Sequence, residues 1–250
     1  MTRKSHLPNE PMISFIIPAY NEEHELPGNL AALHAAAIAA GQPYEIIVVD
    51  DASTDATAEV AKNAGAKVVP ISRRQIAAAR NAGAREACGD VFFFVDADTR
   101  IKTVHIVEAL RCLSDGAAGG GARVVVEDEI PRWARIAVFL FSKIYFGANL
   151  GAGAFLFTRR DSFVRGGGFD EQYFAGEEIY FTQALKKLGK FVLLSEPVIT
   201  SGRKLRIYSA PHILRRTLQI VFGGKNSVRS RDKLDLWYDG KRETGASQLR

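Results

Sequence analysis

Short apolar runs alternate with alanine-rich segments of helical length through the first hundred residues. The apolar runs are largely free of polar residues and rich in Val, Ile and Phe. They fall at Ile13–Pro18, Glu45–Val49, Ala66–Pro70 and Val91–Val95, and the helical segments at Glu25–Ala40, Thr54–Ala64 and Gln75–Cys88. Apolar strands separated by helices are typical of a parallel sheet covered on both faces. We therefore predict an α/β fold with a mostly parallel central sheet and helices on both faces.

The pattern is less regular in the second half of the chain. It predicts strands at Arg123–Val126, Ala154–Thr158 and Phe191–Leu194, and helices at Pro131–Phe146 and Glu177–Leu188. The stretch 133–157 is strongly apolar, but Arg135, Lys143 and Asn149 interrupt it. A bilayer span needs about 20 predominantly apolar residues. We therefore interpret this stretch as a helix followed by a strand.

Composition and pattern together predict the division of the chain. With 47% hydrophobic and 24% charged residues, the composition is that of a globular protein and not of a disordered one. We expect a flexible leader over 1–10 and one α/β domain over 11–200, with a first half at 11–100 and a second at 101–200. A basic helical appendage over 201–239 and a tail over 240–250 complete the chain.

The two cysteines, Cys88 and Cys112, are too few for a disulfide framework. Both lie in helical patterns, so we expect reduced thiols in the core of a cytoplasmic protein. We expect no secretory signal, because the first apolar run, Met12–Ala19, is short and follows a polar leader.

The formal net charge of +5 is unevenly spread. No acidic residue occurs from Arg203 to Arg231, which favours an anionic partner such as phosphate, nucleic acid or a membrane surface, or else a solvated basic face. The segment Pro211–Phe222 has the pattern of an amphipathic helix. It would dock onto its own domain or lie on an anionic membrane, which leaves peripheral attachment at the inner face of the membrane open. We expect no nucleic-acid partner.

Polar residues follow three of the predicted strands, at Pro18–Glu22, Asp50–Ser53 and Asp96–Asp98. In open α/β sheets, ligands bind beyond the carboxyl ends of the strands. Two carboxylates one residue apart, Asp96 and Asp98, can recruit a hard divalent cation that neutralises a diphosphate, although a solvated turn also favours Asp. The pair at Asp50 and Asp51 can accept hydrogen bonds from a base or ribose, whereas Ser53 suits a helix cap.

Two predicted helices carry charged residues that are candidates for an active site. Arg80 lies in an alanine-rich helix, where its guanidinium can pair with acidic strand ends or phosphate, or form a surface salt bridge. Glu177 and Glu178 open another predicted helix. There they either favour the helix dipole or supply a general base.

The order and spacing of six segments resemble the family-two inverting glycosyltransferases of the GT-A fold. The segments are Ile16–Glu22, Ile47–Asp55, Ala79–Gly83, Phe94–Asp98, Gly167–Glu171 and Gly176–Glu178. The resemblance implies a Rossmann-like nucleotide-sugar half followed by an acceptor half. It also implies a nucleotide diphosphate sugar as donor.

The resemblance also assigns roles to individual residues. It implies a nucleotide site lined by Pro18, Ala19, Tyr20 and Glu22, with Asp51 at the base and Arg80 near the nucleotide or diphosphate. Asp98 would ligate Mn²⁺ or Mg²⁺, and Asp96 would contact ribose or the cation. His212 would be a third metal ligand or a surface residue.

The catalytic base would be Glu178, at a position where the family usually has aspartate after glutamate. Because this chain has Glu-Glu there, Glu177 remains an alternative. One base and no nucleophile for a covalent step favour a single inverting displacement by an acceptor hydroxyl.

These residues predict a metal-dependent glycosyltransferase that makes a single transfer. A polymer synthase is disfavoured because no Gln-x-x-Arg-Trp motif follows. A polyprenyl-phosphate sugar synthase is disfavoured because those enzymes lack the Gly-Glu-Asp element, which Gly176–Glu178 nearly matches. The donor would be a UDP- or GDP-sugar and the acceptor a saccharide or lipid-linked molecule. The alternatives are a catalytically impaired nucleotide-sugar-binding module and a sugar-1-phosphate nucleotidyltransferase. The latter needs a glycine-rich loop after the first strand, where this chain has Pro18-Ala19-Tyr20.

Overall fold

The structure, a computed structural model, describes residues 11–126 and 132–203 and six single residues beyond them. The six are Ile207, His212, Arg215, Val228, Arg229 and Leu234. The leader at 1–10, the tail at 240–250 and most of the basic segment therefore lie outside the described residues. So does the predicted amphipathic helix at 211–222, apart from two positions.

One mixed sheet runs through the described residues. Its strands are β1 (Ile13–Ala19), β2 (Tyr44–Asp51), β3 (Lys67–Ile71), β4 (Val91–Val95), β5 (Thr99–Arg100), β6 (Ala117–Val126), β7 (Phe155–Arg159) and β8 (Lys190–Thr200). Their order across the sheet is β3-β2-β1-β4-β7-β6-β8-β5. The pairs β2–β3, β1–β2, β1–β4 and β6–β8 are parallel, whereas β7 is antiparallel to both neighbours and β5 to β8. The predicted mostly parallel sheet is confirmed.

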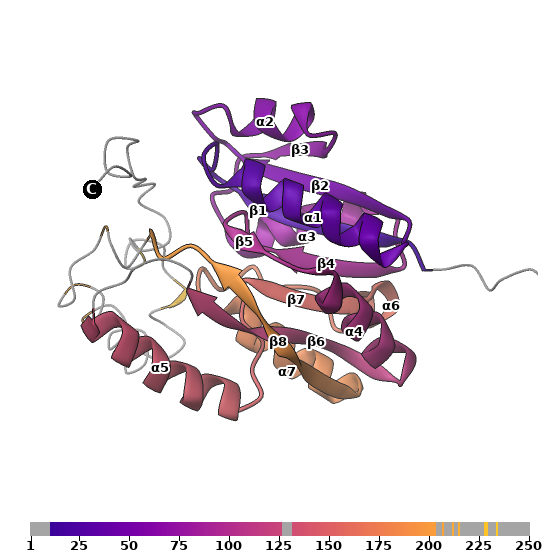
Figure 1. The fold of residues 1–250 in the computed structure, drawn as a ribbon, viewed down its shortest axis with the longest axis vertical. Helices are drawn as coiled ribbons and strands as arrows, with labels where there is room; N and C mark the ends of the chain where they lie inside the picture. The colour runs from indigo at the N-terminus through magenta and orange to yellow at the C-terminus, as the bar shows by residue number, and fades with distance from the viewer. Residues whose placement is uncertain are drawn as a thin grey trace, which may run out of the picture.

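Helices cover both faces of this sheet (Figure 1). The helices are α1 (Leu26–Ala40), α2 (Thr57–Asn63), α3 (Ile76–Glu86), α4 (Thr103–Ser114), α5 (Arg132–Gly147), α6 (Arg160–Arg165) and α7 (Glu177–Leu188). Successive side chains of a strand point to opposite faces. Accordingly, Phe15 and Ile17 pack in one core cluster with α1 and α4, and Ile16 packs in a second with α3 and α7.

Strand β6 is much longer than the predicted segment Arg123–Val126, because it also includes the small residues 117–122, three of them glycines. A Cβ atom on Gly120 would collide with the Phe157 ring and the carbonyl oxygen of Val192. Glycine is therefore required by the close approach of the neighbouring strands. Helices α4 and α6 and the extension of β8 to Thr200 were also absent from the sequence prediction.

The cysteines do not lie in the core. Cys88 is exposed just beyond α3, and Cys112 is half-buried in α4. The predicted burial of Cys88 was wrong because α3 ends at Glu86, and Cys88 lies in the connection to β4.

Helix α5 carries exposed aromatic side chains, Trp133 and Phe139, on the apolar stretch noted in the sequence. The Lys143 ammonium lies 4.9 Å from the centroid of the Phe139 ring. None of the helices in the described ranges combines the length and apolarity that crossing a bilayer requires.

Three non-glycine residues have left-handed backbones near the carboxyl ends of the parallel strands. Asn21 follows β1 with φ 52°, Ala52 follows β2 with φ 61°, and Arg74 precedes α3 with φ 49°. Such conformations cost about 1–3 kcal/mol each and gather at functional sites. Alanine lacks a polar side chain that could offset this cost locally, so Ala52 is the clearest case.

Replacing Ala52 by glycine is expected to raise the free energy of unfolding by about 1 kcal/mol, because glycine adopts positive φ without strain. Ala52 is exposed, so the change removes no core packing. The matched control is Ala35→Gly at an exposed interior position of α1, which should lower the same free energy by about 1 kcal/mol. Urea denaturation measures both. Destabilisation by Ala52→Gly would contradict the assignment of strain to this turn.

Candidate active site

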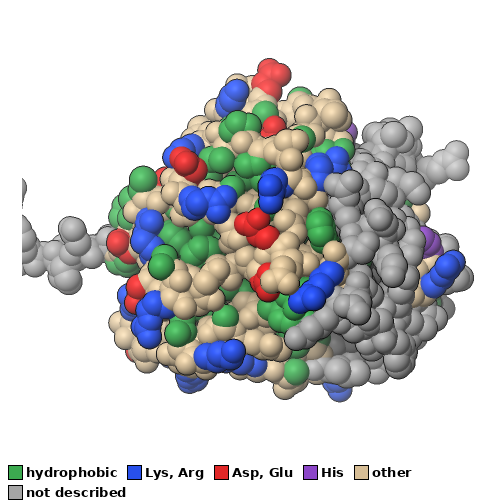
Figure 2. Space-filling model, turned by 180° about the vertical axis from the view of Figure 1, so that it is seen from behind, with side chains coloured by type: hydrophobic (Ala, Val, Ile, Leu, Met, Phe, Trp, Pro, Cys, Tyr) green, Lys and Arg blue, Asp and Glu red, His purple; other side chains and the backbone are tan. Residues whose placement is uncertain are grey.

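A cleft opens to solvent at the carboxyl ends of β1, β2 and β4. Its lining includes most of the residues singled out in the sequence: Pro18, Ala19, Tyr20, Glu22, Asp51, Asp96 and Asp98. On the face opposite to that of Figure 1, acidic side chains lie between lysine and arginine side chains near the centre of the view (Figure 2). The three polar strand ends therefore meet at one rim of the sheet.

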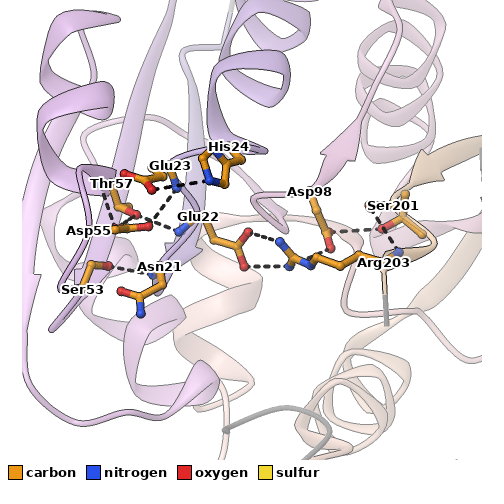
Figure 3. Close-up of polar contacts among 11 residues, drawn as sticks. Asn21, Glu22, Glu23, His24, Ser53, Asp55, Thr57, Asp98, Ser201 and Arg203 are labelled. Atoms are coloured by element: carbon orange, nitrogen blue, oxygen red, sulfur yellow. Dashed lines mark hydrogen bonds and ion pairs between the residues drawn. The ribbon is translucent and has the colours of Figure 1, made fainter. Parts of the chain in front are cut away.

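The loop after β1 is held by the loop after β2 (Figure 3). The Glu22 amide donates to the Thr57 hydroxyl at 2.7 Å, and that hydroxyl donates to Asp55 at 2.5 Å. The Asn21 amide donates to the Ser53 hydroxyl at 3.0 Å. These contacts fix the backbone at Glu22 and direct its side chain into the cleft.

The buried Asp51 carboxylate accepts three backbone hydrogen bonds from the segment that enters α3. The amides of Arg73 and Arg74 donate to Oδ1, and the amide of Gln75 donates to Oδ2, each at 2.7 Å. Asp51 therefore shapes the wall of the cleft as well as lining it. A carboxylate has about four lone-pair positions, so one position on Oδ2 remains.

An arginine and a tyrosine stack at the same rim. The Arg74 guanidinium carbon lies 3.1 Å from the centroid of the Tyr20 ring, and both residues line the cleft. A guanidinium over an aromatic ring is a favourable arrangement. It presents a planar surface suited to a nucleobase.

Arg80 lies below the cleft and is not part of its lining. Its side chain is 2% exposed and donates to Glu177 at 2.7 Å, to Asp96 at 2.9 Å and to the carbonyl of Gly153 at 3.0 Å. Burial disfavours the charged guanidinium, but the two carboxylates outweigh burial and raise the pKa of Arg80. Arg80 therefore links the end of β4 to the start of α7.

The two glutamates at the start of α7 have different surroundings. Glu177 is buried and paired with Arg80. Glu178 is half-buried and accepts a long hydrogen bond of 3.4 Å from the Tyr145 hydroxyl. Burial, and after it the negative charge of Glu177, raises the pKa of Glu178 to about 8. Burial also raises the pKa of Glu177, although the charge of Arg80 acts against this rise. Glu178 makes no ion pair among the described residues and is therefore the better candidate for proton exchange.

Asp98 is paired with an arginine that the sequence motifs did not identify. Arg203 follows β8, and its guanidinium donates to both carboxylate oxygens of Glu22, at 2.8 and 2.9 Å (Figure 3). The same guanidinium lies 3.6 Å from Oδ2 of Asp98, whose Oδ1 accepts from the Thr200 hydroxyl at 3.2 Å. Only the start of the basic segment at Arg203 hinted at this residue, and nothing in the sequence singled out Tyr145.

Asp96 and Asp98 are suited to bind a divalent cation whose remaining coordination positions are filled by a diphosphate. A Mg²⁺-like ion is commonly held by one or two carboxylates together with substrate phosphates and water. Asp96 and Asp98 supply such carboxylates at the cleft. Within the described residues, no three His, Cys, Asp or Glu side chains gather as a metal site, so half-buried His212 does not complete a set with the aspartates.

The chain belongs to glycosyl transferase family 2, whose family model matches residues 14–165, more than half of the sequence. The resemblance seen in the motifs is therefore confirmed.

Curated relatives match over shorter segments. A 4,4'-diaponeurosporenoate glycosyltransferase of Staphylococcus haemolyticus is 37% identical over 105 residues, which are 39% of this chain and 27% of that protein. An undecaprenyl-phosphate 4-deoxy-4-formamido-L-arabinose transferase of Pectobacterium atrosepticum is 34% identical, covering 42% and 34%. A dolichol-phosphate mannosyltransferase of Pyrococcus furiosus is 34% identical, covering 48% and 36%. The matches thus span about a third of these relatives' length.

Solved structures share the fold at low sequence identity. The mannosyltransferase PcManGT of Pyrobaculum calidifontis, in complex with GDP-Man and Mn²⁺, superposes with a TM-score of 0.62 at 21% identity, covering 83% of this chain and 61% of that one. A mannosyl-3-phosphoglycerate synthase of Rubrobacter xylanophilus gives 0.60 at 21% identity, covering 96% and 78%. TarS 1–349 of S. aureus, in complex with UDP-GlcNAc, gives 0.60 at 19%, covering 95% and 76%. The predicted GT-A fold is confirmed.

Proposed function

We propose that the protein is a metal-dependent glycosyltransferase that moves a sugar from a nucleoside diphosphate sugar to an acceptor hydroxyl with inversion. The observation that carries the proposal is the charge pattern of the cleft. Carboxylates from three strand ends meet at one rim, and Glu178, with its raised pKa, opens the helix that Arg80 ties to that rim. Membership in glycosyl transferase family 2 supports the same chemistry.

The donor would lie along the rim formed by β1, β2 and β4. Tyr20 and Arg74 would face the base, Asp51 would accept a hydrogen bond from it, and Asp96 would contact ribose or the cation. Asp98, with Asp96, would hold a divalent cation, for which Mn²⁺ in the PcManGT complex is the precedent. When bound, the cation supplies positive charge to the departing diphosphate. Arg80 would act indirectly, by holding Asp96 and Glu177.

The catalytic base would be Glu178, because Glu177 is committed to Arg80. The acceptor oxygen would form a bond to the anomeric carbon while the bond to the diphosphate oxygen breaks. The hydroxyl proton would pass to the Glu178 carboxylate, and the electron pair would leave with the nucleoside diphosphate. One displacement without a covalent intermediate inverts the anomeric configuration.

The acceptor is proposed to be a saccharide or lipid-linked molecule that receives one sugar. Two of the relatives are an undecaprenyl-phosphate and a dolichol-phosphate sugar transferase. The segment Gly176–Glu178 argues against the polyprenyl-phosphate sugar synthases for this chain, because those enzymes lack such an element. The second half, 101–200, would contribute the acceptor side through Tyr145 and α7. We propose a cytoplasmic protein whose basic segment at 201–239 can attach to the inner face of the membrane.

Incubation with UDP-sugars or GDP-sugars and Mn²⁺ tests the activity through release of nucleoside diphosphate. We expect slow release by the unaltered protein and at least a hundredfold loss in Asp98→Asn, because a divalent ion needs the carboxylate charge. Glu108→Gln in α4 controls for the removal of an acidic residue and should leave release unchanged. Nucleotide-sugar binding without any turnover would instead favour the catalytically impaired binding module.

The hydrogen bonds of Asp51 favour uracil over guanine as the donor base. Guanine presents two adjacent donors, N1–H and the exocyclic amino group, which match both oxygens of a carboxylate. Uracil presents one donor, N3–H. Because Oδ1 of Asp51 already accepts two amides and Oδ2 one, a single further hydrogen bond fits.

UDP should therefore bind at least tenfold more tightly than GDP in the presence of Mn²⁺, as measured by isothermal titration calorimetry. A hydrogen bond to a charged group contributes about 1.5–3 kcal/mol, which corresponds to about tenfold or more in affinity. CDP is the matched control ligand, since it has the size of UDP but no N3–H, and it should bind as weakly as GDP. Equal or tighter binding of GDP would refute the assignment of Asp51.

The pH dependence of kcat/KM tests Glu178 as the base. Its raised pKa means that the carboxylate is protonated and inactive below about pH 8. kcat/KM should therefore rise about tenfold per pH unit below that value and level off above it. Glu178→Gln should lose this rise and at least a hundredfold in kcat.

Glu177→Gln serves as the matched variant. It should lower the free energy of unfolding by about 2 kcal/mol, because the buried Arg80 guanidinium loses a charged partner. Glu178→Gln should not destabilise the fold, because burial already disfavours the ionised carboxylate. Retention of the pH profile in Glu178→Gln would show that another group takes the proton.

A further inference from the structure

Arg203 joins three segments that are far apart in the sequence at a single point of the cleft. Glu22 follows β1, Asp98 follows β4, and Arg203 follows β8 (Figure 3). The side chains of Arg203, Glu22 and Asp98 are only 7%, 11% and 17% exposed. Arginine stays charged at all accessible pH values, so this guanidinium is a fixed cation beside Asp98.

The two contacts of Arg203 are unequal. With Glu22 it forms a bidentate pair at 2.8 and 2.9 Å, and Glu22 itself is fixed by Thr57. With Asp98 it has one contact at 3.6 Å. Bidentate arginine–carboxylate pairs are the strong ones. Arg203 can therefore give up Asp98 and remain on Glu22, without movement of the loop after β1.

A divalent ion and Arg203 compete for the same carboxylate. An ion at Asp98 would place two more positive charges next to a guanidinium in a poorly solvated site, where repulsion is weakly screened. A nucleoside diphosphate brings negative charge that can face both cations. The electrostatic conflict is then removed.

From this arrangement we infer that Arg203 acts as a competing internal cation at Asp98, so that divalent metal enters the site together with the nucleoside diphosphate and not ahead of it. The inference rests on the proposed function and adds an order of binding to it. Arg203 is in this sense a positioning residue, which acts on the metal site through Asp98 and Glu22.

Titration with Mn²⁺ in the absence of nucleotide tests the inference. Bound Mn²⁺ is measured by the loss of the free Mn²⁺ signal in electron paramagnetic resonance. We expect the unaltered protein to bind Mn²⁺ weakly and UDP to strengthen this binding at least tenfold. Arg203→Gln should bind Mn²⁺ alone at least tenfold more tightly than the unaltered protein. Arg111→Gln removes one positive charge from an exposed position on α4 and should change nothing.

Two further variants attribute the effect to the pair at the cleft. Arg203→Lys keeps the charge and should bind Mn²⁺ alone as weakly as the unaltered protein. In Arg203→Gln/Asp98→Asn, the gain should disappear. Should Arg203→Gln fold poorly because Glu22 loses its bidentate contact with Arg203, Glu22→Gln/Arg203→Gln removes both charges and should show the same gain.

Tight binding of Mn²⁺ alone by the unaltered protein, or a gain that survives Asp98→Asn, would overturn the inference and leave the proposed function intact. The proposed function fails in a different way, namely if UDP, GDP and CDP all leave Mn²⁺ binding unchanged and none of them binds. The inference falls with it in that case.

Discussion

The buried guanidinium of Arg80 is the interaction on which the arrangement of the site depends. A buried guanidinium needs charged partners, and that of Arg80 has two, Glu177 and Asp96. These partners come from different halves of the chain, so the pair of contacts places the start of α7 next to the end of β4. Helix α3 can deliver Arg80 to this place because it lies close to the sheet. A Cβ atom on Gly83 would collide with the side chain of Ile16.

The same interaction separates the roles of neighbouring carboxylates. Glu177 and Asp96 share the charge of Arg80. Glu178 lies one residue further along α7 and forms no ion pair within the part of the chain that the structure describes. It lies near both of those negative charges, which add to the effect of burial in raising its pKa. One helix start therefore carries a carboxylate that is paired with Arg80 followed by one that is not, and burial raises the pKa of both. Aspartate in place of Glu178 would keep the carboxylate but place it one methylene closer to the backbone of α7.

Much of the fold could be predicted from the sequence because the first half repeats one simple unit, an apolar strand followed by a helix. The carboxyl ends of β1, β2 and β4 then had to meet, and with them Glu22, Asp51 and Asp98. What could not be predicted depends on contacts between distant residues. The glycine run of β6 has the sequence pattern of a loop, and only the close approach of Phe157 and Val192 in the structure explains why it is a strand. Arg203 belongs to no sequence motif and becomes part of the site only because β8 brings it next to Glu22. Tyr145 also belongs to no motif, and it reaches Glu178 from α5. The sequence predicted that Arg80 could pair with an acidic strand end, and its pair with Asp96 confirms this. Its burial was not predicted, because burial cannot be read from a helix pattern with alanine on every side.

The division of the domain near residue 100 does not correspond to a break in the structure. Strand β5, at Thr99–Arg100, pairs with β8, and β4 pairs with β7, so one sheet continues through this point. The core cluster beneath α1 also contains Phe93 from the first half together with Phe155 and Leu194 from the second. A rigid-body motion of one half against the other would break strand pairs and open this core. The two halves are therefore coupled through a common sheet, and we expect adjustment on ligand binding at its rim and not between the halves. The guanidinium between Glu22 and Asp98 is such a side chain, since one of its contacts is short and the other is long.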